Sequence, residues 1–569
     1  MSKPSRLIGL GAALLLLSAC STFDGGSGSP PGPEGYRPQP AAQRGGTLVM
    51  SDFEYPRTLN PLSALTDLEL RLGGLVFSPL WGLDDQLRPY PELAREVPSA
   101  ANGGVKTAAN GRSMTVDVKL AGGLRWSDGQ ELTADDVLFT LQAVRDPATP
   151  AVTPPGLDRI KDARRVSATE LLLTFDGVYA PYLEIGAALF VMPAHRLRGV
   201  PHAQWSQDQF FQRPDLSSGP FAVREAVPGA QITFQANPRY PTSGQAHRHL
   251  PNLDQLVFKA QSGKPALLSA LKSGGADLAF HLTPNDLPTV TGIATSSPLV
   301  FYGLRDQSLR PNHAENSASG QPPPWLDDRR VLDALDRAVD RSELVRQALA
   351  GAGQAARGLY PRALRGYAEG VRIAPSRDLK SAQQLLREAG WSRGSDGVQV
   401  KGGRRLEFGL VTICGSGLND RVMQVLRSEW QDLGAVVGTG CLSRDDYLRA
   451  TDRGGFDMAL ASDGWGPDPN DWAALAPDQE TQAGWRCEDD DLEGALRRGA
   501  STLAADARRT AYFQAEREWL NYHCTMPLLE LPQVSQVSTR LHNFSPSPGY
   551  GLETWNAADW WLSPAPAPG

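Results

Sequence analysis

Apolar and polar residues are arranged along this chain with two different periods, one typical of strands and one typical of helices. Residues 46–50 form a short apolar run, as in a buried strand, and residues 114–120 alternate, as in a strand with one solvated face. A helical spacing of apolar residues runs through Leu379, Ala382, Leu385, Leu386 and Ala389, and Gly390 then acts as a stop signal. Because such strands and helices interleave along the chain, the pattern predicts an α/β protein.

The starts of the predicted helices carry residues that can cap free backbone amides. Thr133 precedes an apolar stripe, and the aspartates between them suit the positive end of a helix. Asp340, with Glu343 three residues later, resembles a capping box. Another amphipathic stretch ends at Gly434, a residue type that often terminates helices. Local signals therefore predict helix ends in several parts of the chain.

The first twenty residues have the organisation of an export signal. Lys3 and Arg6 precede an apolar run at residues 7–17, which is too short to span a bilayer permanently. The stretch that ends at Cys20 resembles the lipobox of bacterial lipoproteins, which implies a signal peptide at residues 1–19 and diacylation of Cys20. We therefore expect an exported protein that is anchored to the cell envelope by its lipid. The anchor would lie on the periplasmic side of a membrane or on the outer face of the cell membrane.

Residues 20–44 are rich in Gly and Pro and cannot bury enough apolar surface to offset their ordering entropy. We predict a flexible tether there, with the fold beginning near Gly45. The remaining chain, about 525 residues, exceeds what one hydrophobic core usually supports, so two or more lobes are expected.

Charge and hydropathy exclude some classes of protein. The formal net charge is −7, and removal of Lys3 and Arg6 with the signal makes it −9. The chain has no basic stripe that would bind nucleic acid. No later segment has 18 consecutive apolar residues, so no second membrane span is predicted.

Four cysteines remain if Cys20 carries lipid, and an even number in an exported protein favours two disulfides. Four cysteines allow three pairings, among which sequence alone does not choose. We favour Cys414 with Cys441 and Cys487 with Cys524, because this pairing closes the shortest loops. The alternative is free buried thiols.

Signatures of catalysis and of metal binding are weak. Ser269 and Lys272 match a Ser-x-x-Lys motif without the Lys-Thr-Gly that should follow, so a helix surface is favoured. His247 and His249 are the only close histidine pair, and solvated loop residues are the better interpretation. The acidic run from Asp489 lacks the twelfth-position Glu of a Ca²⁺ loop and reads as a helix start. We predict no catalytic residue, no metal site and no cofactor.

Tryptophans gather in the last fifth of the chain. Aromatic side chains supply large contact areas at low entropy cost, so they suit a ligand cleft as well as a core. Packing in a core is the favoured role, and contact with a ligand in a cleft is the alternative. The tryptophans concerned are Trp465, Trp472, Trp485, Trp519, Trp555, Trp560 and Trp561.

An ordered series of motifs gives the chain a resemblance to a known family. The strongest match runs from Leu124 to Val137, and it is accompanied by matches at residues 45–48, 58–61, 79–82, 218–221, 237–240, 326–331, 338–341 and 382–391. In this order they resemble the family 5 extracellular solute-binding proteins, the peptide- and nickel-type receptors of ABC importers. The resemblance covers about Gly45 to Trp561, which is nearly the whole mature chain.

The resemblance implies a two-lobed fold of the type II periplasmic-binding-protein class, with an extra subdomain in lobe one and a hinge between the lobes. Lobe one is then expected at residues 45–300 and again at 528–569, and lobe two at residues 301–527. The chain would cross between the lobes near residue 300 and at Met526-Pro527-Leu528.

Peptide-binding members of the family pair the ligand's α-ammonium with an Asp of a Trp-x-x-Asp motif, which an Asp-Pro pair follows. Trp465-Gly466-Pro467-Asp468 fits the motif and makes Asp468 the candidate anchor, but Asp468-Pro469 fits the later pair equally. On that second alignment the anchor is missing, and Asp463 is the nearest substitute. The wall of lobe two is expected to hold Arg444, Trp465, Gly466 and Asp468, and lobe one to contribute the loop around Thr66.

The implied function is a lipid-anchored receptor, monomeric when it binds, that captures an oligopeptide and delivers it to an ABC permease without covalent chemistry. A second interpretation keeps the receptor and replaces the peptide with an oligosaccharide, a nickel chelate or an opine. A third is a periplasmic enzyme or chaperone on the same fold. The enzyme would need a nucleophile–base pair in the cleft, and the sequence shows none.

Overall fold

The computed structural model describes residues 36–564 except 153–154, 242–248, 316, 318–319, 365, 368–370, 471–486 and 488. The predicted signal peptide, Cys20, His247, Trp472 and Trp485 lie outside the described residues. Within them, no helix combines the length and the apolar character that a membrane crossing requires.

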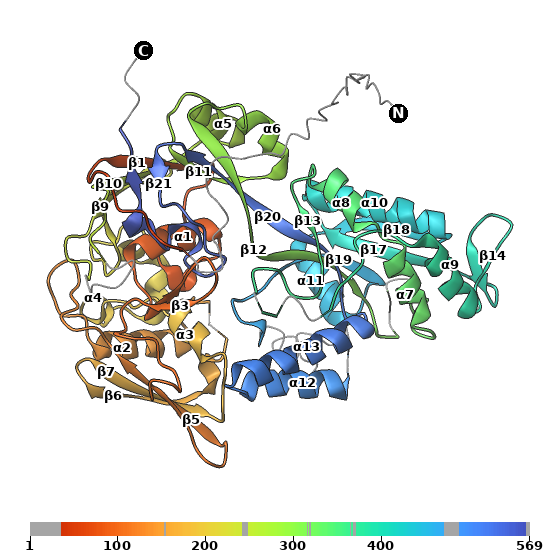
Figure 1. Ribbon diagram of the computed structural model, residues 1–569, viewed down its shortest axis with the longest axis horizontal. Helices are drawn as coiled ribbons and strands as arrows, with labels where there is room; N and C mark the ends of the chain where they lie inside the picture. The colour runs from red at the N-terminus through yellow and green to blue at the C-terminus, as the bar shows by residue number, and fades with distance from the viewer. Residues whose placement is uncertain are drawn as a thin grey trace, which may run out of the picture.

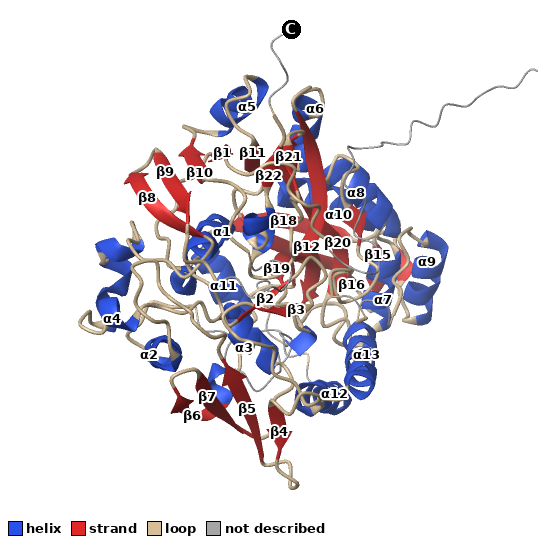
Figure 2. Ribbon diagram, turned by 60° about the vertical axis from the view of Figure 1, so that its left-hand side comes forward, coloured by secondary structure: helices blue, strands red, loops and turns tan. Residues whose placement is uncertain are grey.

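One eleven-stranded mixed sheet organises the molecule (Figures 1 and 2). One of the eleven strands, β13 (Gln354–Ala355), pairs with β20 outside the main order. Across the sheet that order is β18 (Val436–Leu442), β17 (Glu407–Ile413), β19 (Met458–Gly464), β12 (Ser296–Pro311), β20 (Met526–Ser538), β11 (Leu278–Leu282), β1 (Thr47–Asp52), β10 (Gln255–Ala260), β9 (Gln231–Ala236) and β8 (Phe221–Val227).

The long strands β12 and β20 run between two groups of elements, which Figure 1 shows on its left and right. They pair antiparallel from Ser296 opposite Ser538 to Tyr302 opposite Pro532, and again from Asp306 opposite Glu530. The pairing shifts in between, so that residues 303–305 of β12 have no partner on β20. The two strands therefore form the connection between the two groups.

Two large hydrophobic cores lie on either side of this connection. One contains residues between Leu48 and Phe280 together with the C-terminal stretch from Leu541 to Leu562. The other contains residues between Leu309 and Leu460 together with Met526, Leu528 and Leu529. The molecule is thus a two-lobed α/β protein, as the sequence predicted, and the end of the chain returns to the first lobe.

The helices cover both lobes, and several of them begin and end where local signals placed them. Thr133 caps α2 in a capping box with Asp136, Asp340 caps α8, and Gly434 ends α10 with a φ of 99°, a conformation that glycine adopts without strain. The helices are α1 (Asp67–Val76), α2 (Ala134–Arg145), α3 (Tyr182–Ala188), α4 (Ala194–Leu197), α5 (Lys264–Lys272), α6 (Leu287–Val290), α7 (Arg330–Arg337), α8 (Arg341–Ala348), α9 (Leu379–Glu388), α10 (Gly417–Leu433), α11 (Arg444–Arg453), α12 (Asp490–Ser501) and α13 (Ala505–Asn521).

A separate four-stranded sheet forms the extra subdomain of the first lobe, at the bottom of Figure 2. The predicted alternation at residues 114–120 is confirmed, since the inward side chains of β5 are buried and the others are half-buried. The strands outside the central sheet are β4 (Val105–Thr107), β5 (Ser113–Lys119), β7 (Glu170–Asp176) and β6 (Ile160–Ser167) in the subdomain, and the short pieces β2 (Trp81–Leu83), β3 (Pro89–Pro91), β14 (Ser392–Arg393), β15 (Gln399–Lys401), β16 (Arg404–Arg405), β21 (Leu541–His542) and β22 (Trp561–Leu562).

The tether predicted at residues 20–44 extends too far toward the fold. Tyr36 donates a hydrogen bond to Asp559 at 3.0 Å, and its ring lies edge-on to Trp555 with centroids 5.2 Å apart. The backbone of Gln39 exchanges two hydrogen bonds of 2.9 Å with the side chain of Asn543. Residues 36–44 are polar in composition but find partners in the C-terminal stretch, which no local signal reveals.

Candidate functional site

The parallel strands of both lobes point their carboxyl ends at the connection between the lobes. In the second lobe, β17, β18 and β19 are parallel, and the end of β19 places Gly464 opposite Arg305 of β12. In the first lobe, β1 and β11 are parallel, and the end of β11 places Leu282 opposite Val534 of β20. Open α/β sheets bind ligands beyond the carboxyl ends of their strands. The strip between these two edges is therefore the candidate site.

Asp463 lies at the end of β19, on the edge that faces the strip. Its carboxylate accepts a hydrogen bond from the Ser308 hydroxyl at 2.9 Å and forms an ion pair with Arg310. Both partners come from β12, which pairs with β19. The charge of Asp463 is therefore compensated within the second lobe.

Trp465 follows β19 and is 8 % exposed. Its indole Nε1 donates to Asp306 Oδ2 at 3.1 Å, and its ring meets the edge of Tyr360 with centroids 5.1 Å apart. Asp306 is itself 5 % exposed, and its Oδ1 accepts no hydrogen bond from the described residues. Burial, and then the neighbouring carboxylate of Asp463, raise the pKa of Asp306 well above its usual range.

Asp468 lies three residues beyond Trp465 in the same loop. Its Oδ1 accepts hydrogen bonds from Arg508 Nη2 at 2.6 Å and from the backbone of Asn470 at 2.8 Å. Burial by itself would lower the pKa of Arg508, but the Asp468 carboxylate raises it above the usual arginine range. Gly466 lies in the loop between Trp465 and Asp468 and is half-buried.

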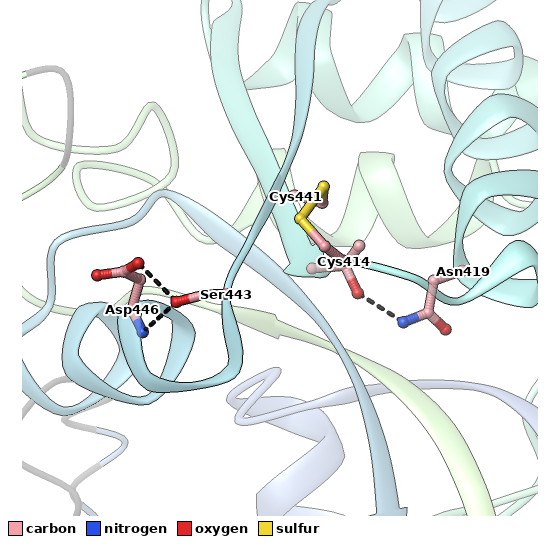
Figure 3. Close-up of a disulfide and its surroundings, with 6 residues drawn as sticks. Cys414, Asn419, Cys441, Ser443 and Asp446 are labelled. Carbon is pink, nitrogen blue, oxygen red and sulfur yellow. Dashed lines mark hydrogen bonds between the residues drawn. A yellow bond between two sulfur atoms is a disulfide. The ribbon is translucent and has the colours of Figure 1, made fainter.

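Arg444 is the exposed first residue of α11, directly beyond the end of β18. Ser443 caps this helix by accepting from the backbone of Asp446 at 3.2 Å, while its hydroxyl donates to the Asp446 carboxylate at 2.6 Å (Figure 3). Cys414 and Cys441 form a disulfide between the ends of β17 and β18. The disulfide fixes the strand ends from which α10 and α11 begin.

The favoured cysteine pairing is the one that the structure contains, because Cys487 is bonded to Cys524 in the second disulfide. This second bridge joins the segment before α12 to the end of α13. The hairpin of α12 and α13 contacts the first lobe, where the Ala180 backbone donates to Ala500 at 2.8 Å and Leu503 packs against the first core. Figure 1 shows the hairpin at the lower edge of the second lobe.

Thr66 belongs to the first lobe and caps α1, accepting from the backbone of Glu69 at 3.3 Å. The side chain is exposed. Its neighbour Asp67 forms an ion pair of 3.0 Å with Arg305 of β12. The Thr66 loop therefore lies beside the strip, and Asp463 and Trp465 contact β12 from the other edge. Arg444 begins the helix after β18, and Gly466 and Asp468 follow Trp465 in its loop.

Sequence reasoning missed a carboxylate–histidine pair in the first lobe. Asp52 ends β1 and is fully buried, and its Oδ2 lies 2.8 Å from Nδ1 of His281, near the end of β11. His281 is 26 % exposed, has a φ of 56° and sits where the pairing of β11 with β20 is irregular. The sequence could have identified Asp52 as a site residue, because it is a carboxylate just after a predicted buried strand. No neighbouring residue in the sequence identifies His281. Arg508, on a distant helix, was also missed.

The other candidate motifs have ordinary structural roles. Ser269 and Lys272 are exposed on α5. Asp489 caps α12, and His249 lies 2.6 Å from Asp559. Among the residues that the structure describes, no three His, Cys, Asp or Glu side chains are grouped to hold a metal ion. Of the late tryptophans that are described, Trp465 adjoins the strip and Trp519 is buried in the same cluster as Trp465 and Leu304. Trp560 and Trp561 are buried near the end of the chain, and Trp555 is half-buried there.

Comparison of the sequence with known proteins finds relatives along most of the chain. Oligopeptide-binding protein AppA of Bacillus subtilis is 25 % identical over 466 residues, which are 79 % of this chain and 78 % of that protein. Di/tripeptide-binding protein 2 of Pseudomonas aeruginosa is 25 % identical over 450 residues, which are 76 % of this chain and 78 % of that protein.

Solved structures share the fold. AppA of Bacillus subtilis in complex with a nonapeptide has a TM-score of 0.69 at 21 % identity, covering 93 % of this chain and all of that one. NikA of Brucella suis in complex with Fe(III)-EDTA has a TM-score of 0.76 at 17 % identity, covering 91 % of this chain and all of that one. The family model described as bacterial extracellular solute-binding proteins, family 5 Middle, matches residues 88–483. The chain belongs to the family 5 bacterial extracellular solute-binding proteins.

Proposed function

We propose that this chain is the lipid-anchored substrate-binding component of an ABC importer and that it captures oligopeptides between its two lobes. The observation that carries the proposal is the pair of facing edges: the carboxyl ends of β1 and β11 oppose those of β17, β18 and β19 across a connection of only two long strands. Relatives named for oligopeptide binding and for di- and tripeptide binding support the ligand class.

In this proposal residues 45–300 and 528–569 form lobe one, residues 301–527 form lobe two, and residues 303–305 serve as part of the hinge. Ligand contacts with both lobes exist together only when the lobes close, so ligand shifts the equilibrium toward the closed form. We propose ligand contacts from Thr66 in lobe one and from Arg444, Asp463, Trp465 and Gly466 in lobe two. Transport needs no covalent chemistry, and the protein acts as a monomer with diacylated Cys20 as its anchor.

A non-peptide ligand is the second candidate, and one observation favours it. Both candidate ammonium anchors, Asp463 and Asp468, are already paired with arginines. Structures of the same fold include NikZ of Campylobacter jejuni in complex with Ni(L-His) and the protein AgaA in complex with agropinic acid. A ligand without an ammonium group would not need an ion pair with Asp463 or Asp468.

Native mass spectrometry of the full-length receptor, purified in detergent from cells grown in rich medium, tests the proposal. Peptide function predicts a ladder of bound masses that fragment into amino-acid residues. A single non-peptide mass, or a series of sugars, would contradict the peptide and retain the receptor. Retention of a hydrolysed product together with loss of the added substrate would contradict the receptor itself.

A further inference from the structure

The carboxylate of Asp468 is committed to partners within the second lobe. Arg508 and the backbone of Asn470 both donate to its Oδ1, at 2.6 and 2.8 Å. The Asp468 side chain is 14 % exposed and that of Arg508 is 12 % exposed, so water screens the pair only weakly. A carboxylate that a guanidinium already neutralises offers little attraction to the ammonium group of a ligand.

Arg508 is held in place from several directions. Its Nε donates to the backbone carbonyl of Gly499 at 3.0 Å, and its guanidinium lies 5.3 Å from the centre of the Tyr512 ring. The side chain projects from α13 at a position fixed by these contacts. Arg508 therefore cannot leave Asp468 to an incoming ammonium without losing its hydrogen bond to Gly499 and its contact with Tyr512 as well.

Among the residues that the structure describes, the carboxyl groups at the end of β19 and around Trp465 offer no replacement. Asp463 is paired with Arg310 and accepts a hydrogen bond from Ser308. Asp306 is buried beneath Trp465, which donates to it, and burial raises the pKa of Asp306, which favours its neutral form. Of the three carboxyl groups around Trp465, none combines an ionised state with the lack of a counter-charge.

The same ion pair connects the loop after β19 to an inter-lobe contact. Arg508 belongs to the α12–α13 hairpin, whose Ala500 accepts a hydrogen bond of 2.8 Å from Ala180 in the first lobe. Leu503, between the two helices, packs against the core of the first lobe. Asp468 thus links the loop that holds Trp465 to the hairpin that contacts the other lobe.

We propose that the Asp468–Arg508 pair is a structural link that stands in place of an ammonium anchor, so that the receptor binds oligopeptides with a blocked amino terminus as well as those with a free one. This inference rests on the peptide function proposed above and narrows its ligand class. Recognition then falls to the peptide backbone and side chains, and the terminal charge contributes little.

A competition between two mixed-sequence pentapeptide pools tests the ligand class. The full-length receptor in detergent is incubated with equal amounts of a free-amine pool and an N-acetylated pool, and the retained peptides are counted by mass spectrometry. We expect the two pools to be retained at similar levels. A preference of about tenfold or more for free amines, which is the scale of one charge-assisted hydrogen bond, would overturn the inference. Retention of neither pool would instead overturn the peptide function, and the inference with it, because the free-amine pool then fails as well.

Variants test the structural role of the pair. We expect Asp468→Asn and Arg508→Gln each to lower the melting temperature, and the double variant to recover part of the loss, without a change in the ratio of retained pools. Glu131→Gln, which breaks an exposed pair with Arg125, is the control and should leave both readouts unchanged. The double variant keeps the ratio measurable if a single variant does not fold. Selective loss of the free-amine pool in the double variant would show that Asp468 binds the ammonium and would overturn the proposal.

Discussion

Glu516 on α13 is a carboxyl group buried without a counter-charge. It is fully buried, its Oε1 accepts from the backbone of Leu359 at 2.9 Å, and no cation among the described residues pairs with it. Burial raises the pKa of Glu516 to about 7. Asp463 and Asp468 differ, because each lies against an arginine. All three are carboxyl groups, and of the three only Glu516 has no cationic partner among the described residues.

The substitution Glu516→Gln should flatten the dependence of stability on pH. Because the native pKa lies above the unfolded one, the native state holds the extra proton between about pH 4.5 and pH 7. The stability from this group is therefore complete at low pH and is lost as pH rises through about 7. Relative to wild type, the variant should gain up to about 3 kcal/mol of unfolding free energy at pH 8. Urea unfolding between pH 5 and pH 8 measures this, with Glu518→Gln on the same helix as control. A parallel fall in wild type and variant would contradict the assignment.

Asp463→Asn should destabilise the receptor by leaving Arg310 without its counter-charge. Removing one member of a buried pair costs about 3–5 kcal/mol, and the partial exposure of this pair reduces the expected loss to about 2 kcal/mol. The double variant with Arg310→Gln should recover part of that loss. Glu131→Gln, whose carboxylate forms an exposed pair with Arg125, should change stability by less than about 0.5 kcal/mol. Chemical unfolding of the wild type and the three variants measures these losses. Equal effects at Asp463 and Glu131 would show that the ion pair of Asp463 with Arg310 contributes nothing to stability.

At the scale of elements, local signals located helices and their ends, and long-range partners stayed out of reach. Thr133 and Gly434 act through backbone groups within four residues, so the sequence suffices to predict their roles. The pairing of β12 with β20 joins residues more than two hundred positions apart and depends on how two cores pack. For the same reason the resemblance located the Asp468 loop, but the Arg508 that compensates Asp468 could not be predicted.

Loss of the Cys414–Cys441 disulfide should loosen one edge of the second lobe. The bridge closes a loop with a sequence separation of 27 residues and ties the end of β17 to the end of β18. Replacement of both cysteines by alanine should lower the unfolding free energy by about 2–4 kcal/mol. Hydrogen exchange should become faster in β18 and at the start of α11 and stay unchanged in β1, which serves as an internal control. Uniform acceleration in both lobes would contradict a local effect.

At the scale of the whole molecule, two kinds of contact hold the lobes together. The connection through β12 and β20 is covalent and includes the segment 303–305 that β20 does not pair with. The contacts of Ala500 and Leu503 with the first lobe are non-covalent and far from that segment in the chain. A rotation of one lobe away from the other would keep the strand connection and break the non-covalent contacts of Ala500 and Leu503. Leu87 of the first lobe also packs against the cluster around Trp465, so the hairpin contact is one of the non-covalent contacts that should set the balance between open and closed forms.

The substitution Leu503→Ala tests this balance, and Leu385→Ala is its matched control. Both leucines are half-buried, but Leu503 packs against the core of the other lobe, whereas Leu385 packs against the core of its own lobe from α9, which Figure 1 shows at the far side of the molecule. Leu503→Ala should remove about 1 kcal/mol of apolar stabilisation from the closed form and none from the open form. Retention of a mixed-sequence pentapeptide pool should then be about fivefold weaker. Small-angle scattering should also give a larger radius of gyration for Leu503→Ala than for wild type with the pool present. Leu385→Ala should lower the unfolding free energy by a similar amount and leave retention and radius unchanged. If both variants weaken retention equally, the hairpin contact has no special role in closure.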